Sequence, residues 1–194
     1  MGLGAARLIW HRKRMPYEPP PELAALSLGE IADLIAARKL PPVDSWSPAK
    51  RGDSHMRIAA DGRWYHEGGL ITRPAMVRAF ASLLMRDDEG HWLVTPVEKL
   101  SIAVDDAAFI ATDVRQDGDA LVFRLNTDDL VIADADHPIR AAGDPDTPAL
   151  YLGVRHGTEA RLNRSTYGQL AEIALQSDDL SVSSRGNRFS LVPA

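Results

Sequence analysis

Two segments of the chain follow one pattern, and this repetition constrains the fold more than any other feature. Residues 56–96 and 150–193 each read as apolar runs broken by a turn, then a helix, then a strand that stops at a proline. An offset of 91 residues places Arg73 on Arg164, and the residues on the apolar faces of the two helices match as well. We therefore predict an α+β fold in which a β-β-α-β core is duplicated, giving two structurally related small domains.

The predicted helices are where the repeats differ least. The first opens at Arg73 and continues to about Arg86, and the second opens at Arg164 and continues to about Gln176. Apolar residues recur three and four positions apart along both, as on one face of an amphipathic helix.

Short apolar runs separated by Asp and Gly turns lie between the repeats, at 100–104, 109–114, 120–125 and 130–133. This spacing is typical of antiparallel strands. The polar segment 137–148 is predicted to be a loop. We place the domain boundary near Val97, with an N-terminal helix and the first repeat in 1–97 and a strand-rich second repeat in 98–194.

The N-terminal part precedes both repeats. Residues 1–14 carry four basic and no acidic side chains, and the proline-rich stretch 16–21 is predicted to be a linker. Ser27 and Glu30 have the spacing of a capping box and predict a short helix. We expect neither a signal peptide nor a membrane span.

Composition excludes several classes of protein. The 194 residues contain no cysteine, which excludes disulfides, thiol nucleophiles and cysteine-ligated metals. A net charge of -5 argues against general nucleic-acid binding. We expect a cytoplasmic protein.

Familiar catalytic motifs are missing from the sequence. His66-Glu67 begins like a zinc-protease helix motif, but Leu70 stands where the second histidine is needed. The chain has no nucleophile elbow and no glycine-rich phosphate loop. These absences favour a non-enzymatic protein without a metal or cofactor.

Arg73 and Arg164 are the first candidate ligand contacts. A guanidinium beside the free amides of a helix start can bind phosphate or carboxylate. The alternative is a structural salt bridge, for example from Arg73 to Glu98 or Asp105.

Aromatic and polar residues near the expected domain junction complete the candidate site. Trp64 and His66 share one face of a strand, with Glu67 next to them, and form either the edge of a core or a platform on which a ring could stack. Thr95, Glu98 and Lys99 lie at the junction, and ligand clefts often form between domains.

Several stretches of the chain resemble an uncharacterised proteobacterial family, a domain of unknown function. They are Asp61–Gly68, Ile71–Arg73, Phe80–Leu84 and, most specifically, Leu93–Lys99, followed by Val104–Asp106 and Phe109. This chain has Ala108 where such members have proline, which makes that turn less rigid. The resemblance implies a duplicated α+β core, a C-terminal half loosely like a pleckstrin-homology domain, a nucleotide-like ligand at the domain interface and a role in signal transduction.

The predicted function is therefore non-enzymatic binding of a small, anionic, nucleotide-like ligand in the interdomain cleft, with a signalling role. The predicted ligand contacts are Trp64, His66, Glu67, Arg73, Thr95, Glu98, Lys99 and Arg164. Two alternatives stay open: a protein-interaction module that uses the C-terminal sheet, and a hydrolase or transferase with His66 as its base.

Overall fold

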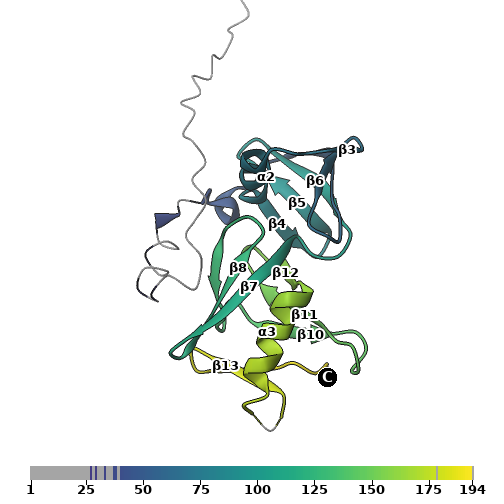
Figure 1. Cartoon of the computed structure of the whole chain (residues 1–194). Helices are drawn as coiled ribbons and strands as arrows, with labels where there is room; N and C mark the ends of the chain where they lie inside the picture. Colours follow the sequence, from purple (N-terminus) through teal and green to yellow (C-terminus); the bar gives the residue numbers. More distant parts are fainter. Residues whose placement is uncertain are drawn as a thin grey trace, which may run out of the picture.

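The computed structural model describes residues 40–177 and 179–193, together with Ser27, Gly29, Asp33, Ala37 and Arg38. The basic arm, the proline-rich stretch and most of the helix predicted after Ser27 lie outside the described residues. Two six-stranded sheets form the bulk of the molecule, the first above the second in Figure 1.

The first sheet has the strand order β3-β2-β1-β6-β5-β4. A short 3-10 helix, η2, precedes it, and one α-helix, α2, lies between its third and fourth strands. The elements are η2 (Val43–Ser45), β1 (Lys50–Ile58), β2 (Trp64–His66), β3 (Gly69–Leu70), α2 (Pro74–Ala81), β4 (Leu84–Asp87), β5 (Gly90–Val94) and β6 (Glu98–Val104). Neighbouring strands are antiparallel, except that β1 and β6 run parallel.

The second sheet has the strand order β10-β11-β12-β7-β8-β9, and a helix and a small hairpin follow it in the chain. The elements are β7 (Phe109–Asp117), β8 (Ala120–Leu125), β9 (Leu130–Ile132), β10 (Ile139–Ala142), β11 (Ala149–Gly153), β12 (Glu159–Leu162), α3 (Arg164–Ala174), β13 (Ser181–Ser184) and β14 (Asn187–Ser190). Here β7 and β12 are the parallel pair.

The two sheets have the same topology. In each, the chain forms a three-stranded meander and then a second one, whose last strand pairs in parallel with the first strand of the sheet. The predicted duplicated α+β core and the strand-rich second half are thereby confirmed. The strand order matches β1–β6 with β7–β12, however, so the helices are not equivalent: α2 lies within the first set of strands, and α3 follows the second set.

Three local predictions need correction. Because β6 pairs with β1 and β5, the predicted boundary at residue 97 moves to the segment between Val104 and Phe109. The first helix ends at Ala81 rather than Arg86, since residues 84–87 pair with β5. The segment 137–148 contains β10, which pairs with β11 and is no simple loop.

One connected core runs through both domains. Trp64 of the first domain and Phe109, Phe123 and Leu152 of the second are among its largest fully buried side chains. The helix α3 contributes Thr166, Leu170 and Ala174 at intervals of four residues, all buried. Burial of this apolar surface is the main force that holds the domains together.

Tight turns bring the two domains into contact. The backbone N–H of Arg86 in β4 donates to the carbonyl of His156, 2.8 Å away, in the turn before β12. The next residue, Gly157, has φ +75°, and a Cβ there would lie 2.6 Å from the Arg86 carbonyl oxygen. The contact therefore requires glycine. Among the described residues, no helix is long and apolar enough to cross a membrane.

Candidate functional site

The hairpin formed by β2 and β3 provides one wall of a pocket in the first domain. Glu67 and Gly68 join the strands with φ of 50° and 81°, the pair of positive values that a two-residue type I′ turn requires. His66 lies opposite Met56 of β1 in the strand pairing. Trp64, two residues earlier on the same face, is 1% exposed and stacks on Phe80 at a centroid distance of 6.4 Å. His66 lies beyond this covered part of the strand and is exposed.

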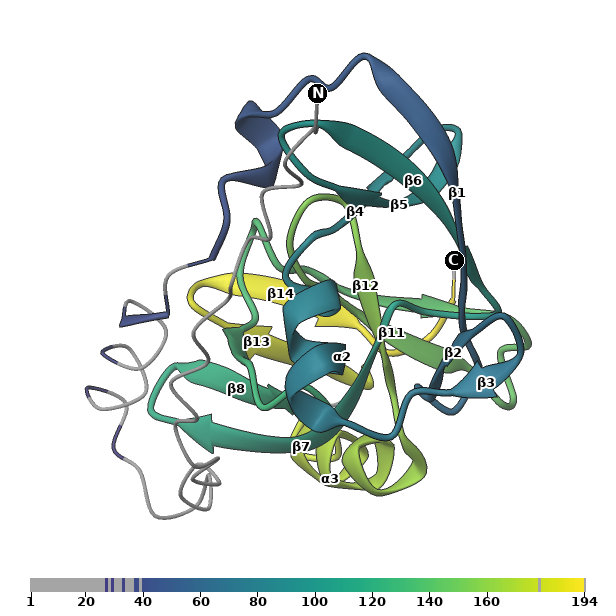
Figure 2. The same cartoon turned by 90° about the horizontal axis from the view of Figure 1, so that it is seen from above.

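The helix α2 provides the facing wall. It begins after Arg73, whose backbone is extended (φ -92°, ψ 108°), and Pro74 occupies its first turn. Proline suits this position because its missing N–H would have no partner within the helix. Met76 and Phe80, four residues apart, face the hairpin together. Residues 71–73 join the hairpin to the helix (Figure 2).

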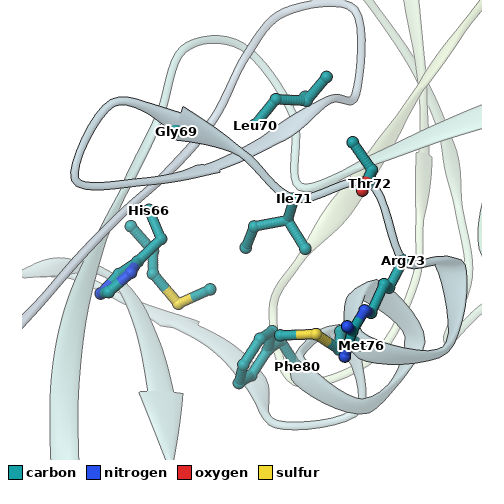
Figure 3. A pocket seen from close by; sticks show the side chains of 9 residues that line it. His66, Gly69, Leu70, Ile71, Thr72, Arg73, Met76 and Phe80 are labelled. Atoms are coloured by element: carbon teal, nitrogen blue, oxygen red, sulfur yellow. The ribbon is translucent and has the colours of Figure 1, made fainter.

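Between these walls lies a cavity of about 620 Å³, called the ligand pocket below because it is the candidate site for the predicted ligand. His66 lies on one side and Arg73, Met76 and Phe80 lie on the other, with Leu70 and Ile71 between them (Figure 3). The residues that line it are Met56, His66, Gly69, Leu70, Ile71, Thr72, Arg73, Met76 and Phe80.

The lining of this pocket is apolar except for two nitrogen-bearing side chains and one hydroxyl. The guanidinium of Arg73 and the imidazole of His66 can both donate hydrogen bonds, and Thr72 adds a hydroxyl. No described residue that lines the pocket carries a carboxylate. The pocket therefore suits a ligand with an apolar or flat body and an anionic group.

A second, smaller cavity of about 210 Å³ lies at the domain junction. Leu70, Ile71 and Thr72 line both cavities, and Asn126 of the second domain lines this one. Trp64 lines it too, and its indole nitrogen Nε1 is buried without a hydrogen-bond partner among the described residues. A buried donor of this kind is costly unless an acceptor reaches it.

The predicted ligand contacts fall in several different places. His66 and Arg73 line the ligand pocket, and Trp64 lines the junction cavity. Glu67 is an exposed turn residue whose backbone N–H donates to the His55 carbonyl. Arg164 is exposed at the start of α3 in the second domain.

Thr95, Glu98 and Lys99 are engaged elsewhere in the first domain. The Thr95 hydroxyl donates to the Glu98 carbonyl at 3.2 Å and so closes the turn between β5 and β6. Glu98 accepts from Lys50 at 2.7 Å. Lys99 donates to Asp87 at 2.5 Å, and its Nζ lies 4.5 Å from the centre of the Trp92 ring.

These contacts also bear on the protonation of Asp87 and on the partners of Arg73. Hydrogen bonds from Lys99, the larger cause, and from Trp92 lower the pKa of Asp87 from 3.8 to about 2.

The two carboxylates considered as salt-bridge partners of Arg73 are paired with other cations, Glu98 with Lys50 and Asp105 with Arg57. Arg73 has no ion pair with any residue that the structure describes.

Sequence reasoning did not assign the apolar lining of the pocket to a site. The helical spacing of Met76 and Phe80 predicts that both belong to the core, yet Met76 is 37% exposed, and Leu70 of the hairpin is 47% exposed. Whether these side chains are buried in the core or line a pocket depends on the distance between α2 and the hairpin, which the local spacing of residues does not determine. Within the described part of the chain, no three His, Asp or Glu side chains are placed to hold a metal ion.

Comparisons with known proteins agree with this architecture. The models of the two domains of one family match residues 41–107 (Domain of unknown function (DUF1285), N-terminal domain) and 108–191 (Protein of unknown function (DUF1285), C-terminal domain). A crystal structure of a DUF1285 family protein from Silicibacter pomeroyi DSS-3 is 40% identical, with a TM-score of 0.73, and the match covers 87% of this chain and 96% of that one.

A second crystal structure shares the fold at lower identity. It is of a DUF1285 family protein from Shewanella baltica OS155, 24% identical, with a TM-score of 0.51 over 60% of this chain and 90% of that one. No curated protein matches the chain. The division between the two family domains, at residues 107 and 108, falls in the same segment as the passage from the first sheet to the second. The chain is a member of the DUF1285 family and contains both of its domains.

Proposed function

We propose that this protein binds a small anionic ligand with an apolar or ring-shaped body in the ligand pocket, without transforming it. The single observation that carries the proposal is the pocket itself, where Arg73 and His66 lie on opposite sides of an otherwise largely apolar lining. Its volume of about 620 Å³ falls within the range usual for small-molecule sites. A nucleotide-like molecule, with a flat base and a phosphate, has this combination of properties.

The arrangement of charge supports anion binding at one end. Arg73 is exposed at the start of α2, where the positive end of the helix dipole also attracts negative charge. A phosphate or carboxylate would receive hydrogen bonds from the guanidinium, and the ring would rest against Met76 and Phe80. A signalling role follows if the bound state is the one that other proteins recognise.

Binding is better supported than catalysis by His66. In a site where a histidine acts as general base, a third group commonly orients the imidazole. Among the described residues, carboxylates pair with His55, His137 and His156, but none pairs with His66. His66 therefore serves the proposal as a hydrogen-bond donor.

The test is titration with 1-anilinonaphthalene-8-sulfonate, an aromatic anion, followed by calorimetry with a panel of nucleotides. Trp64 fluorescence provides a second signal because its ring stacks on Phe80, which lines the pocket. Arg73→Ala should weaken binding of the probe by about tenfold or more, the effect of one lost charge-assisted hydrogen bond.

Arg164→Ala is the matched control. Arg164 is also an exposed arginine at a helix start, but it lies in the second domain, away from the pocket. It should leave the affinity unchanged. Equal affinity in both variants, or no saturable binding of the probe or of any nucleotide, would rule the proposal out.

A further inference from the structure

The helix α2 has two functional faces within eight residues. Met76 and Phe80 line the ligand pocket. Val77 and Arg78 line the junction cavity, and Ala81 is fully buried. An α-helix of this length spans only about 12 Å, so a ligand on one face lies within one or two turns of the contacts made by the other.

The second face binds the second domain directly. Arg78 Nη1 lies 3.4 Å from Asp128 Oδ2. The carbonyl of Ala81, in the last turn of α2, accepts a hydrogen bond of 3.1 Å from Arg155 Nη2. Both contacts reach across the junction from the first domain to the second.

Arg155 is held firmly on its own side. It donates to Asp129 at 3.1 Å, and its guanidinium lies 4.9 Å from the centre of the Phe109 ring. Asp129 is 4% exposed and also accepts from Thr127 at 2.9 Å. Burial lowers the pKa of Arg155 to about 10. Removing an acceptor from so poorly hydrated a guanidinium raises the free energy of the folded protein, because water does not replace that acceptor.

The attachment of α2 to its own sheet is weaker. Ala81 is its one buried residue, and Val77 and Phe80 pack against the core while only partly buried, whereas α3 buries three residues. The end of α2 is therefore positioned by Arg155 and Arg78 as much as by the core of the first domain. A helix held in this way can move when its pocket face is loaded.

We propose that α2 couples occupancy of the ligand pocket to the contact between the two domains. A group packed against Met76 and Phe80 displaces the helix and changes the hydrogen bond between Ala81 and Arg155. The biological ligand rests on the proposed function, but the coupling itself can be tested without one. Linkage requires it to be reciprocal, so changes at Arg155 alter affinity in the pocket.

The lack of cysteine allows the pocket to be filled covalently. In Met76→Cys the new thiol is the only one in the chain, and N-phenylmaleimide attached there places a ring in the pocket. Val97→Cys, carrying the same label, is the control, since Val97 is 72% exposed in the turn between β5 and β6.

Two amide signals report on the junction. The N–H of Ser82 belongs to the same peptide group as the Ala81 carbonyl, so its NMR shift responds to the bond with Arg155. The N–H of Arg86, which donates to His156, reports on the junction by its hydrogen-exchange rate. The label at residue 76 should move the Ser82 resonance and change the Arg86 exchange rate by about fivefold or more. The label at residue 97 should do neither; equal effects of the two labels, or no effect of either, would overturn the coupling.

The reverse direction uses Arg155→Lys, which keeps the charge but loses the fork of donors. It should change the affinity for 1-anilinonaphthalene-8-sulfonate by about fivefold or more, although Arg155 does not line the pocket. Arg188→Lys, whose arginine pairs with Asp179 far from α2, should leave the affinity unchanged. If Arg155→Lys does not fold, the labelling experiment decides alone.

The outcomes separate the two proposals. Probe binding that depends on Arg73, without any response of Ser82 or Arg86 to the label, would leave the proposed function standing and remove the coupling. A response to the label in a protein that binds no probe would support the coupling and remove the proposed function.

Discussion

The first domain inserts α2 between its third and fourth strands, whereas the second joins the equivalent strands, β9 and β10, without a helix and adds α3 after its sixth strand. Leu170 of α3 is fully buried, but Met76 of α2 is 37% exposed. The same strand order thus supports two different uses of a helix. In the second domain the helix completes the core, and in the first it forms one wall of a pocket.

The largest expected effect compares these two helices by truncation. Leu170→Ala should destabilise the protein by about 2–5 kcal/mol, because it leaves a cavity in a closed core. Met76→Ala should cost less than about 1 kcal/mol, since its side chain already borders open space. Urea unfolding of both variants measures the difference, and similar losses would mean that α2 is packed as tightly as α3.

The next comparison concerns the glycines through which each domain touches the other. Gly157→Ala should cost about 1–3 kcal/mol, because its φ is +75° and the new Cβ meets the rigid backbone of Arg86. Gly62→Ala should cost less, although its φ is +81°. Its Cβ would lie 2.7 Å from Ile110 Cγ1 and 2.8 Å from Asn126 Nδ2, which are side-chain atoms and can shift more easily than the Arg86 backbone.

Chemical denaturation again provides the measurement for the glycine variants. The hydrogen-exchange rate of the Arg86 amide should also rise more in Gly157→Ala than in Gly62→Ala, because only the first change separates the atoms of that bond. The reverse order would show that the two domains are held together mainly at the Gly62 turn.

The repeat was predictable from the sequence because local signals specify most strands. Apolar runs ending at Asp and Gly turns indicated β6 to β9, and their bounds differ little from those predicted. The equivalence of the two helices was an error of alignment: Arg73 and Arg164 both start helices, yet those helices occupy different places in the strand order. Strand order depends on pairing between segments that are distant in the sequence, and aligning two stretches by a constant offset does not capture that pairing.

The candidate site was less predictable for the same reason. Arg73 and His66 could be singled out because a cation at a helix start and a polar residue at a strand end are locally unusual. Lys99 and Glu98 looked equally suitable, but their partners, Asp87 and Lys50, come from other strands. Whether a charged side chain is free or paired depends on tertiary contacts.

A smaller effect separates the two helix starts. The side chain of Asn163 accepts a hydrogen bond from the Thr166 N–H at 2.8 Å and caps α3. Asn163→Ala should therefore cost about 1 kcal/mol. Arg73 provides no such cap to α2, and a cation there opposes the helix dipole, so Arg73→Ala should leave the stability within about 0.5 kcal/mol of the parent. Thermal unfolding checks both, and a marked loss in Arg73→Ala would give Arg73 a structural role instead of a ligand-binding one.

The last comparison concerns the pH dependence that Asp87 gives to the first domain. Asp87 has a folded-state pKa of about 2, below its ordinary 3.8, chiefly because Lys99 and Trp92 donate to its carboxylate. The unfolded chain therefore takes up this proton first as the pH falls. The stability that Asp87 contributes is present above about pH 4 and is lost between about pH 4 and pH 2.

In Asp87→Asn this contribution should be missing at every pH, so the stabilities of the parent and the variant should converge as acid is added. Urea unfolding at a series of pH values measures this convergence. Asp88→Asn, which removes the exposed neighbouring carboxylate without touching the Lys99 contact, should keep the pH profile of the parent. A profile unchanged by Asp87→Asn would mean that Lys99 is not held by Asp87 in solution, and that its amine is free to meet a ligand as the sequence had suggested.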